Sequence, residues 1–391
     1  MNQLSDVDVQ RRGSGDAGCA VEVRNIHHRY GPHVALDDVS LEVRQGEFVT
    51  LLGQSGSGKT TLLRIIAGLT RPTSGAVSIA GRDVTALAAQ HRGVGFVFQN
   101  YALFPHLNVF ENIAYPLRIR RIRGQELEGR VHAALARIHL PTVGQRYPSE
   151  LSGGQQQRVA VARALVYEPS VLLMDEPLGA LDRKLRRHMQ LELRQLHEDL
   201  RITCIYVTHD QEEALTMSDR VVVMHDGRIL QVGEPADVYR RPASGFVADF
   251  VGSTNMLDGT IISAGTDGLV LQSNQGTMLK LPPRAGVASG SRVRLAVRPE
   301  QIALDADDSR DVHLEAMVKS VVFVGNVVDV TCSLPSGEEL VAQYGDGSNA
   351  CPAVGQRVRL GWRSDAVNFF SVPDDVGETN GGRTGHGWQL S

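Results

Sequence analysis

One glycine-rich octapeptide has the residue types of a phosphate-binding loop. The segment 53–60 reads GQSGSGKT and fits the pattern G-x-x-x-x-G-K-[ST]. Its glycines let backbone N–H groups point at phosphate oxygens, and the helix expected after it adds the positive end of its dipole. Lys59 would reach the β- and γ-phosphates of a nucleotide, and the Thr60 hydroxyl would ligate Mg²⁺. The alternative, a Gly/Ser turn before a helix, rarely produces this pattern by chance.

Two adjacent carboxylates provide a second candidate. Asp175 and Glu176 follow the apolar run 171–174, which is typical of a strand buried on both faces. Ligands bind at the carboxyl ends of such strands in a doubly wound sheet. We expect Asp175 to hold Mg²⁺ through water and Glu176 to polarise an attacking water. Strands that end in Asp-Glu are common, so this interpretation depends on the phosphate loop.

A third candidate is the sequence Leu-Ser-Gly-Gly-Gln at 151–155, which precedes an expected helix. Ser-Gly-Gly at the start of a helix exposes N–H groups and a positive dipole end, so it can bind phosphate. The same residues could serve only as an N-cap and a turn.

The elements that must position these residues alternate in type. Short apolar runs predict buried strands at 48–52, 171–174, 204–207 and 221–224. Helical spacing predicts helices over 59–68, most of 125–168, and 183–200. This alternation implies a parallel sheet covered on both faces. From about 255 to 370 the chain is Val-rich with short alternating runs, which predicts a small all-β barrel or a pair of barrels.

Composition excludes several classes of protein. Lys plus Arg number 40 and Asp plus Glu 44, so the net charge is −4 and there is no electrostatic footprint for nucleic acid. The longest apolar runs fall far short of the roughly 18 residues that a membrane span needs. The four cysteines have no paired spacing, which argues against a disulfide framework or zinc site and fits a reducing cytosol.

The LSGGQ sequence at 151–155 resembles the signature of the ATP-binding subunits of ABC transporters. Other motifs of that family follow in the family's order between about 21 and 252. The resemblance implies an α/β P-loop NTPase core with an antiparallel β subdomain and a helical signature subdomain, followed by a small all-β OB-like barrel. The expected bounds are a flexible leader at 1–19, the ATP-binding domain at 20–252, a TOBE-like accessory domain at 253–372 and a disordered tail at 373–391.

The resemblance also implies roles for individual residues. Glu176 would be the catalytic base, and His209 would hold the γ-phosphate and the water. The residues at ATP-binding positions are Tyr30 (stacked on adenine), Gly53, Gln54, Ser55, Gly56, Ser57, Gly58, Lys59, Thr60, Thr61 and Gln99. The Mg²⁺ positions are Thr60, Gln99 and, through water, Asp175. The residues expected to meet a partner subunit are Ser152, Gly153, Gly154 and Gln155 on its ATP and Asp182 in the dimer loop, where Gly179 replaces the commoner Ser.

Several of these residues have structural alternatives. Tyr30 could be an ordinary strand aromatic, His209 a satisfied core histidine and Gln99 a loop cap. The basic stretch 118–123 is more typical of a solvated helix face than of a binding site.

The resemblance further implies partners. One copy of each motif cannot form a complete site, so two chains would bind two ATP molecules face to face. Two transmembrane permease subunits would dock on the apolar segment 101–105 beside Gln99, and a solute-binding protein would act through them. No nucleic acid is expected, and the location would be the cytoplasmic face of a bacterial inner membrane.

The solute is less specified. The stretches 181–186 and 208–220 look most like spermidine/putrescine importers, but ferric-iron, sulfate, phosphonate and sugar importers share much of this sequence. A non-transport ABC ATPase on ribosomes or DNA would usually carry two ATPase units or a long coiled coil. A further alternative makes the C-terminal β-domain a small-molecule sensor, which could coexist with transport.

Overall fold

The computed structural model describes residues 18–179, 183–284, 286–305, 310–345 and 352–371. Its contacts divide the chain into two compact units, with the division between Ala243 and Ser244. The expected domain boundary, between 252 and 253, lies after the short helix α8 (Gly245–Phe250), which the contacts group with the second unit. The guanidinium of Arg298 explains this grouping, since it donates to the carbonyls of Ala248 and Gly252 at 2.8 and 2.9 Å.

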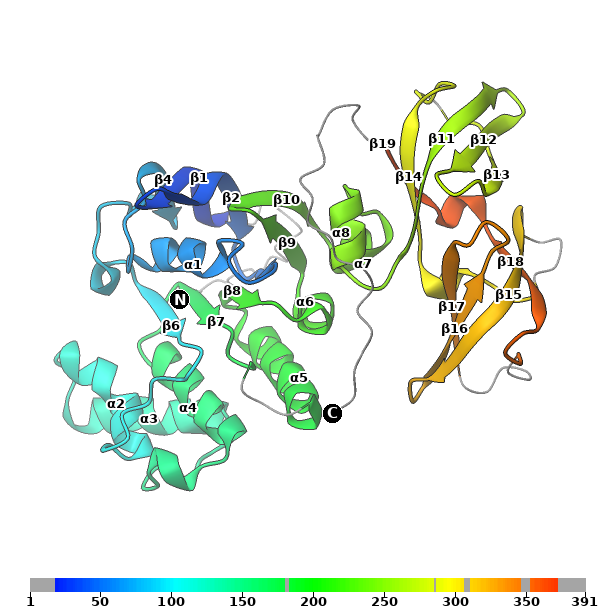
Figure 1. The fold of residues 1–391 in the computed structure, drawn as a ribbon. Helices are drawn as coiled ribbons and strands as arrows, with labels where there is room; N and C mark the ends of the chain where they lie inside the picture. Colours follow the sequence, from blue (N-terminus) through cyan, green and yellow to red (C-terminus); the bar gives the residue numbers. More distant parts are fainter. Residues whose placement is uncertain (1–17, 180–182, 285, 306–309, 346–351, 372–391) are drawn as a thin grey trace, which may run out of the picture. The chain divides into compact units, whose positions relative to one another are not determined.

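A six-stranded sheet forms the centre of the first unit (Figure 1). Its strands in spatial order are β10 (Arg228–Gly233), β9 (Arg220–His225), β3 (Phe48–Leu52), β8 (Thr203–Thr208), β7 (Val171–Asp175) and β6 (Val94–Val97). All neighbours pair in parallel except β10 with β9. Every residue of β3, β7 and β8 is buried, so the predicted parallel sheet with both faces covered is confirmed.

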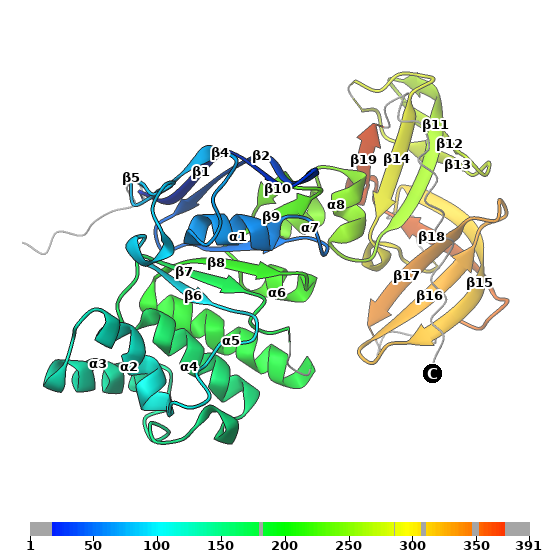
Figure 2. The same ribbon diagram turned by 60° about the vertical axis from the view of Figure 1, so that its left-hand side comes forward.

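Layers of different type cover the two faces of this sheet (Figure 2). On one face lies α1 (Lys59–Ala67), and beyond it a four-stranded sheet. The strands of that sheet in spatial order are β2 (His33–Arg44), β1 (Cys19–Tyr30), β4 (Ser74–Ile79) and β5 (Arg82–Asp83). On the other face α5 (Arg183–Leu200) packs through Met189 and Leu193 against Leu172 and Tyr206. The short helices α6 (Gln211–Met217) and α7 (Pro235–Arg240) complete the unit.

Three helices form a subdomain with its own apolar core. They are α2 (Val109–Ile119), α3 (Gly124–Arg137) and α4 (Gly153–Leu165). Ile113, Val131 and Val159 lie in this core, one from each helix. The prediction of helix over most of 125–168 is wrong for residues 138–152, because Pro141, Gly144 and Pro148 interrupt this stretch. The stretch holds only a 3₁₀ turn at Pro148–Glu150.

The described residues of the second unit are all-β apart from α8 and short 3₁₀ turns, as predicted. One antiparallel sheet has the order β13 (Met278–Leu281), β12 (Gly268–Ser273), β11 (Asn255–Gly265), β14 (Arg292–Val297) and β19 (Asn368–Ser371). The other has the order β17 (Glu339–Gly345), β16 (Val327–Ser333), β15 (Val312–Phe323) and β18 (Arg357–Trp362). Both sheets contribute to one core around Leu271, Val330 and Trp362. Among the described helices, none combines the length and apolar composition that a bilayer span requires.

One buried arginine fixes the C-terminal end of α1. The guanidinium of Arg92 donates to the carbonyls of Ile65 and Ile66 at 2.8 and 3.0 Å, and to those of Thr85 and Leu87 at 3.1 and 2.9 Å. The last carbonyls of a helix have no partner within its regular ladder. Arg92 is a donor to the Ile66 carbonyl and adds a second donor to the Ile65 carbonyl, which also accepts the Gly68 N–H at 3.1 Å.

We therefore predict that Arg92→Ala lowers the free energy of unfolding by about 3 kcal/mol, because four carbonyls lose a charged donor. Urea denaturation measures the change. Arg71→Ala is the matched control, since Arg71 is exposed and makes one long bond, of 3.4 Å, to the Ala86 carbonyl. We expect the control to cost less than about 0.5 kcal/mol, and equal losses in the two variants would contradict the role of Arg92.

Candidate active site

The expected site residues follow the carboxyl ends of four neighbouring strands. Gly53 follows β3, Glu176 follows β7 and His209 follows β8, while Gln99 lies just after β6. The parallel register aligns these ends, with Leu52 paired to Thr208, Asp175 to Val207 and Val97 to Met174. Residues scattered over 157 positions of sequence therefore meet at one edge of the sheet, from Gly53 to His209.

The phosphate loop joins β3 to α1. Its lysine, Lys59, is buried and donates from Nζ to the carbonyls of Gly53 and Gln54 at 2.7 and 2.8 Å. Gly58 has φ +99°, and a Cβ there would lie 2.7 Å from the Ala35 carbonyl oxygen, so only glycine fits. The pattern's lysine thus lies inside a tight loop at the start of the helix, as the sequence predicts.

Beside the loop, a hydroxyl and a carboxylate share a hydrogen bond. Thr60 donates from Oγ1 to Oδ1 of Asp175 at 3.0 Å. Burial raises the pKa of the Asp175 carboxyl, and the bond from Thr60 opposes that shift. Burial also lowers the pKa of the Lys59 ammonium, which the charges of Glu176 and Asp175 oppose. Two hard oxygen atoms next to a phosphate loop are a donor set that suits Mg²⁺.

The Glu176 carboxylate contacts side chains that follow two other strands of the sheet, β6 and β8. Its Oε2 accepts a hydrogen bond from Nε2 of Gln99 at 3.3 Å and lies 3.3 Å from Nδ1 of His209. Its backbone has φ 44°, a conformation that is strained for a residue with a side chain, and its N–H donates to the Val207 carbonyl at 3.0 Å. Backbone strain of this kind is characteristic of functional sites.

Further expected residues lie at the end of β1, at the start of α4 and in α1. Tyr30 ends β1 with about half of its surface exposed, and its ring contacts His28 edge-on at 4.6 Å between centroids. Ser152 caps α4 in the helical subdomain, where its side chain and that of Gln155 bond each other's backbone N–H. Thr61 is part-buried in the first turn of α1. Asp182 lies outside the described residues.

Arg163 on α4 is a residue that sequence analysis missed. Its guanidinium donates to the carbonyls of Ala102 and Tyr101 at 2.7 and 2.8 Å and faces the Phe104 ring. Tyr101 and Ala102 both have positive φ, 60° and 46°, so the arginine holds a strained turn that follows Gln99. Nothing in the spacing of the α4 sequence distinguishes this arginine from a surface residue.

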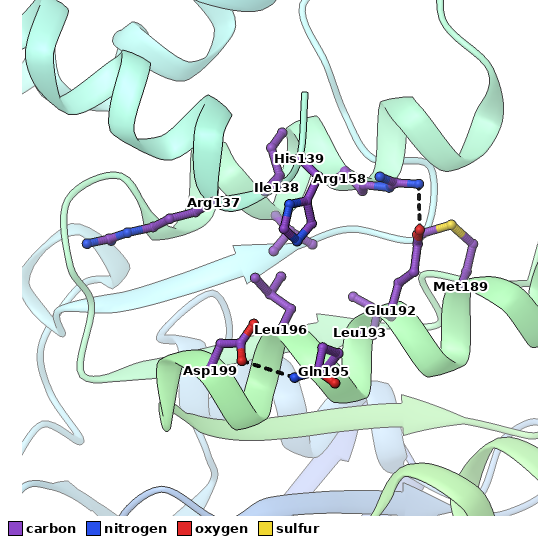
Figure 3. A pocket seen from close by; sticks show the side chains of 11 residues that line it. Arg137, Ile138, His139, Arg158, Met189, Glu192, Leu193, Gln195, Leu196 and Asp199 are labelled. Carbon is purple, nitrogen blue, oxygen red and sulfur yellow. Dashed lines mark hydrogen bonds and ion pairs between the residues drawn. The ribbon is translucent and has the colours of Figure 1, made fainter. Parts of the chain in front are cut away.

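A separate cavity of about 90 Å³ lies between the helical subdomain and α5 (Figure 3). Along its wall Arg158 bonds to Glu192 and Gln195 bonds to Asp199. The described candidate residues for nucleotide binding do not line it, so it is distinct from the site at the sheet edge.

Comparisons with known proteins agree with this geometry. The family model described as ABC transporter matches residues 36–179, and the model described as TOBE domain matches 295–370. The spermidine/putrescine import ATP-binding protein PotA of Rubrobacter xylanophilus is 47% identical over 358 residues, which cover 90% of this chain and 94% of that protein. The sulfate/thiosulfate import ATP-binding protein CysA of Burkholderia mallei is 50% identical over 327 residues, 83% of this chain and 91% of that protein.

A solved structure, the ATP-binding cassette MJ0796 as a dimer bound to ADP and Pi, is 35% identical and covers 55% of this chain and 98% of its own, with a TM-score of 0.49. The family is shown by the two import proteins, which match this chain over nearly their whole length. The chain belongs to the ATP-binding proteins of ABC transporters, and it is an ATPase of the importer type.

Proposed function

We propose that this ATPase drives import of a polyamine such as spermidine or putrescine, as a peripheral subunit on the cytoplasmic face of a bacterial inner membrane. The convergence of Gln99 and His209 on the Glu176 carboxylate, beside the phosphate loop, supports the hydrolytic role. Spermidine/putrescine proteins of Rubrobacter and of Nitrosospira multiformis, at 47% and 43% identity, support the polyamine. The sulfate/thiosulfate protein at 50% identity makes sulfate the second candidate.

In the proposed reaction the residues of this chain bind the phosphates, orient the attacking water and accept one proton from it. Lys59 would bind the β- and γ-phosphates, and Oε2 of Glu176 would accept a proton from the attacking water. His209 would orient that water and the γ-phosphate. The Gln99 amide holds Oε2 of Glu176 in place by its hydrogen bond. Mg²⁺, held by Thr60, Gln99 and, through water, Asp175, would neutralise charge on the phosphates when bound. The tyrosine ring of Tyr30 would stack on adenine.

The ATPase would work as a homodimer. Each chain carries one phosphate loop and one signature, and the signature lies at the N-terminus of α4 in the helical subdomain. Ser152, Gly153, Gly154 and Gln155 would bind the ATP held by the partner's loop, since a helix N-terminus favours an anion.

A groove of about 650 Å³ on the first unit is the proposed docking site for a permease segment. Phe98, Phe104, Tyr115 and Ile119 line it, and Ile119 is 65% exposed. The sequence-based interpretation expected the segment 101–105 itself to supply the apolar surface. Tyr101 is instead buried and Leu103 packs against two cores, because Arg163 turns this segment inward. Ala102 and Phe104 are the residues of that segment that line the groove.

We predict that Glu176→Gln retains ATP binding and loses turnover by a factor of about 10²–10⁴, since the amide cannot accept the proton. Phosphate release measures turnover, and uptake of labelled spermidine, putrescine and sulfate in the native host measures transport. Cells with the variant should lose uptake of the polyamines and keep uptake of sulfate.

This experiment tests the identity of the solute and the catalytic role of Glu176 separately. Loss of sulfate uptake with normal polyamine uptake would replace the solute and leave the importer role. Wild-type turnover in Glu176→Gln would refute Glu176 as the base.

We predict that Lys59→Ala weakens ATP binding, because the phosphates lose a buried cation. Equilibrium titration with a fluorescent ATP analogue measures the affinity.

The dimer is tested by mixing Lys59→Ala chains with Ser152→Trp chains, whose signature is blocked. A mixed dimer would contain one site with both an intact loop and an intact signature, so mixing should restore turnover that neither variant has alone. Absence of recovery at concentrations where mixed dimers form would contradict the shared site.

We predict that Ile119→Glu abolishes copurification with the permease subunits and leaves the ATPase activity of the free protein unchanged, since it places a charge in the apolar groove. Leu69→Glu is the matched control, because Leu69 is also half exposed but lies outside the groove. Equal permease recovery with both variants would rule the groove out as the docking site.

A further inference from the structure

A buried carboxylate lies directly beneath the loop that carries His209. Glu213 on α6 is 2% exposed, and its Oε2 accepts hydrogen bonds from the Tyr206 hydroxyl at 2.8 Å and the Thr208 hydroxyl at 2.7 Å. Burial raises the pKa of Glu213, and these two bonds oppose that shift. Both hydroxyls donate to the same oxygen atom, so both of their protons point toward Glu213.

The bond from Thr208 continues around His209. The Thr208 hydroxyl donates its hydrogen bond to Glu213, so its oxygen lone pairs are available as acceptors. The oxygen accepts a hydrogen bond from the backbone N–H of Asp210 at 3.0 Å. Thr208 and Asp210 are the two neighbours of His209 in the chain. The hydroxyl therefore ties together the backbone on both sides of the histidine.

Asp210 and Arg186 extend this network to α5. Oδ1 of Asp210 accepts the N–H groups of Glu212 and Glu213 at 2.8 and 3.2 Å and so caps α6. Oδ2 of Asp210 accepts a hydrogen bond from Arg186 of α5 at 3.1 Å, and the Arg186 guanidinium lies 3.9 Å from Oε1 of Glu213. The carboxylates of Asp210 and Glu213 each accept several hydrogen bonds, and both lie near the positive charge of Arg186.

We propose that Glu213 is a positioning residue for ATP hydrolysis: through Thr208 it fixes the backbone on either side of His209, and so the distance between His209 and Glu176. This inference rests on the role proposed above for His209. The imidazole is 61% exposed and has its contact with Glu176 at 3.3 Å, so its own packing does little to fix its position. The buried network beneath it supplies that constraint.

Two hydroxyls on one carboxylate offer a matched pair of variants. Thr208→Val and Tyr206→Phe each remove one hydrogen bond to Oε2 of Glu213, and both residues belong to β8. Only the Thr208 hydroxyl also holds the backbone next to His209. A purely structural role for Glu213 would make the two variants alike, whereas a positioning role would separate them.

The experiment measures kcat, ATP affinity and thermal unfolding for the full chain with Thr208→Val, Tyr206→Phe, Glu213→Ala and His209→Ala. We expect both hydroxyl variants to lower the unfolding temperature. Thr208→Val should lower kcat about tenfold with unchanged ATP affinity, while Tyr206→Phe should keep kcat within about twofold of wild type. The double variant Thr208→Val with Glu213→Ala should lose no more kcat than the worse single variant, because both act through one path.

The outcomes are distinguishable. Equal kcat for Thr208→Val and Tyr206→Phe, or additive losses in the double variant, would overturn the positioning role of Glu213 while His209→Ala still abolishes turnover. Turnover retained in His209→Ala would refute the role of His209 itself, and the inference with it. If Glu213→Ala does not fold, Glu213→Gln replaces it in the single and double variants, because Thr208→Val also removes the acceptor of the Asp210 N–H and does not test Glu213 by itself.

Discussion

The parallel register of the central sheet is the constraint on which the site depends. β3, β8, β7 and β6 pair so that their carboxyl ends align, with Leu52 opposite Thr208 and Asp175 opposite Val207. A slip of one residue in one strand would turn its side chains to the opposite faces and move its carboxyl end by roughly 3.3 Å. The apolar burial that stabilises the sheet therefore also determines the distance between the phosphate loop, Glu176 and His209.

This edge gathers charge that burial disfavours. Lys59 and Asp175 both have pKa values shifted toward the neutral form by burial. The protein limits this cost with local hydrogen bonds: Lys59 donates to two loop carbonyls, and Asp175 accepts from Thr60. Such preorganised groups, held in a low-dielectric site, interact more strongly with phosphate charge than the same groups would in water.

Residues in contiguous motifs could be predicted from sequence, whereas those defined by packing could not. The phosphate loop, Asp175 and Glu176 are recognisable because polar residues follow an apolar run, and His209 is recognisable from the family resemblance; the structure places them together. Arg92, Arg163 and Glu213 act on segments distant in sequence or hidden by folding. Their residue types are common on helix surfaces, so only tertiary contacts reveal what they bind. The inward turn at Tyr101 could not be predicted either, because it depends on the tertiary contact with Arg163.

The turn after Gln99 contacts two of the hydrophobic cores, to both of which α4 also contributes. Leu103 packs against the core of the sheet and α5 and also against the core of the helical subdomain. Arg163 anchors the same turn to α4, the helix whose first residues form the signature, and Phe104 beyond it lines the proposed permease groove. Gln99 at the start of the turn bonds Glu176. The residue that bonds Glu176 and the residue that lines the proposed groove therefore belong to one continuous segment, which Arg163 anchors to α4.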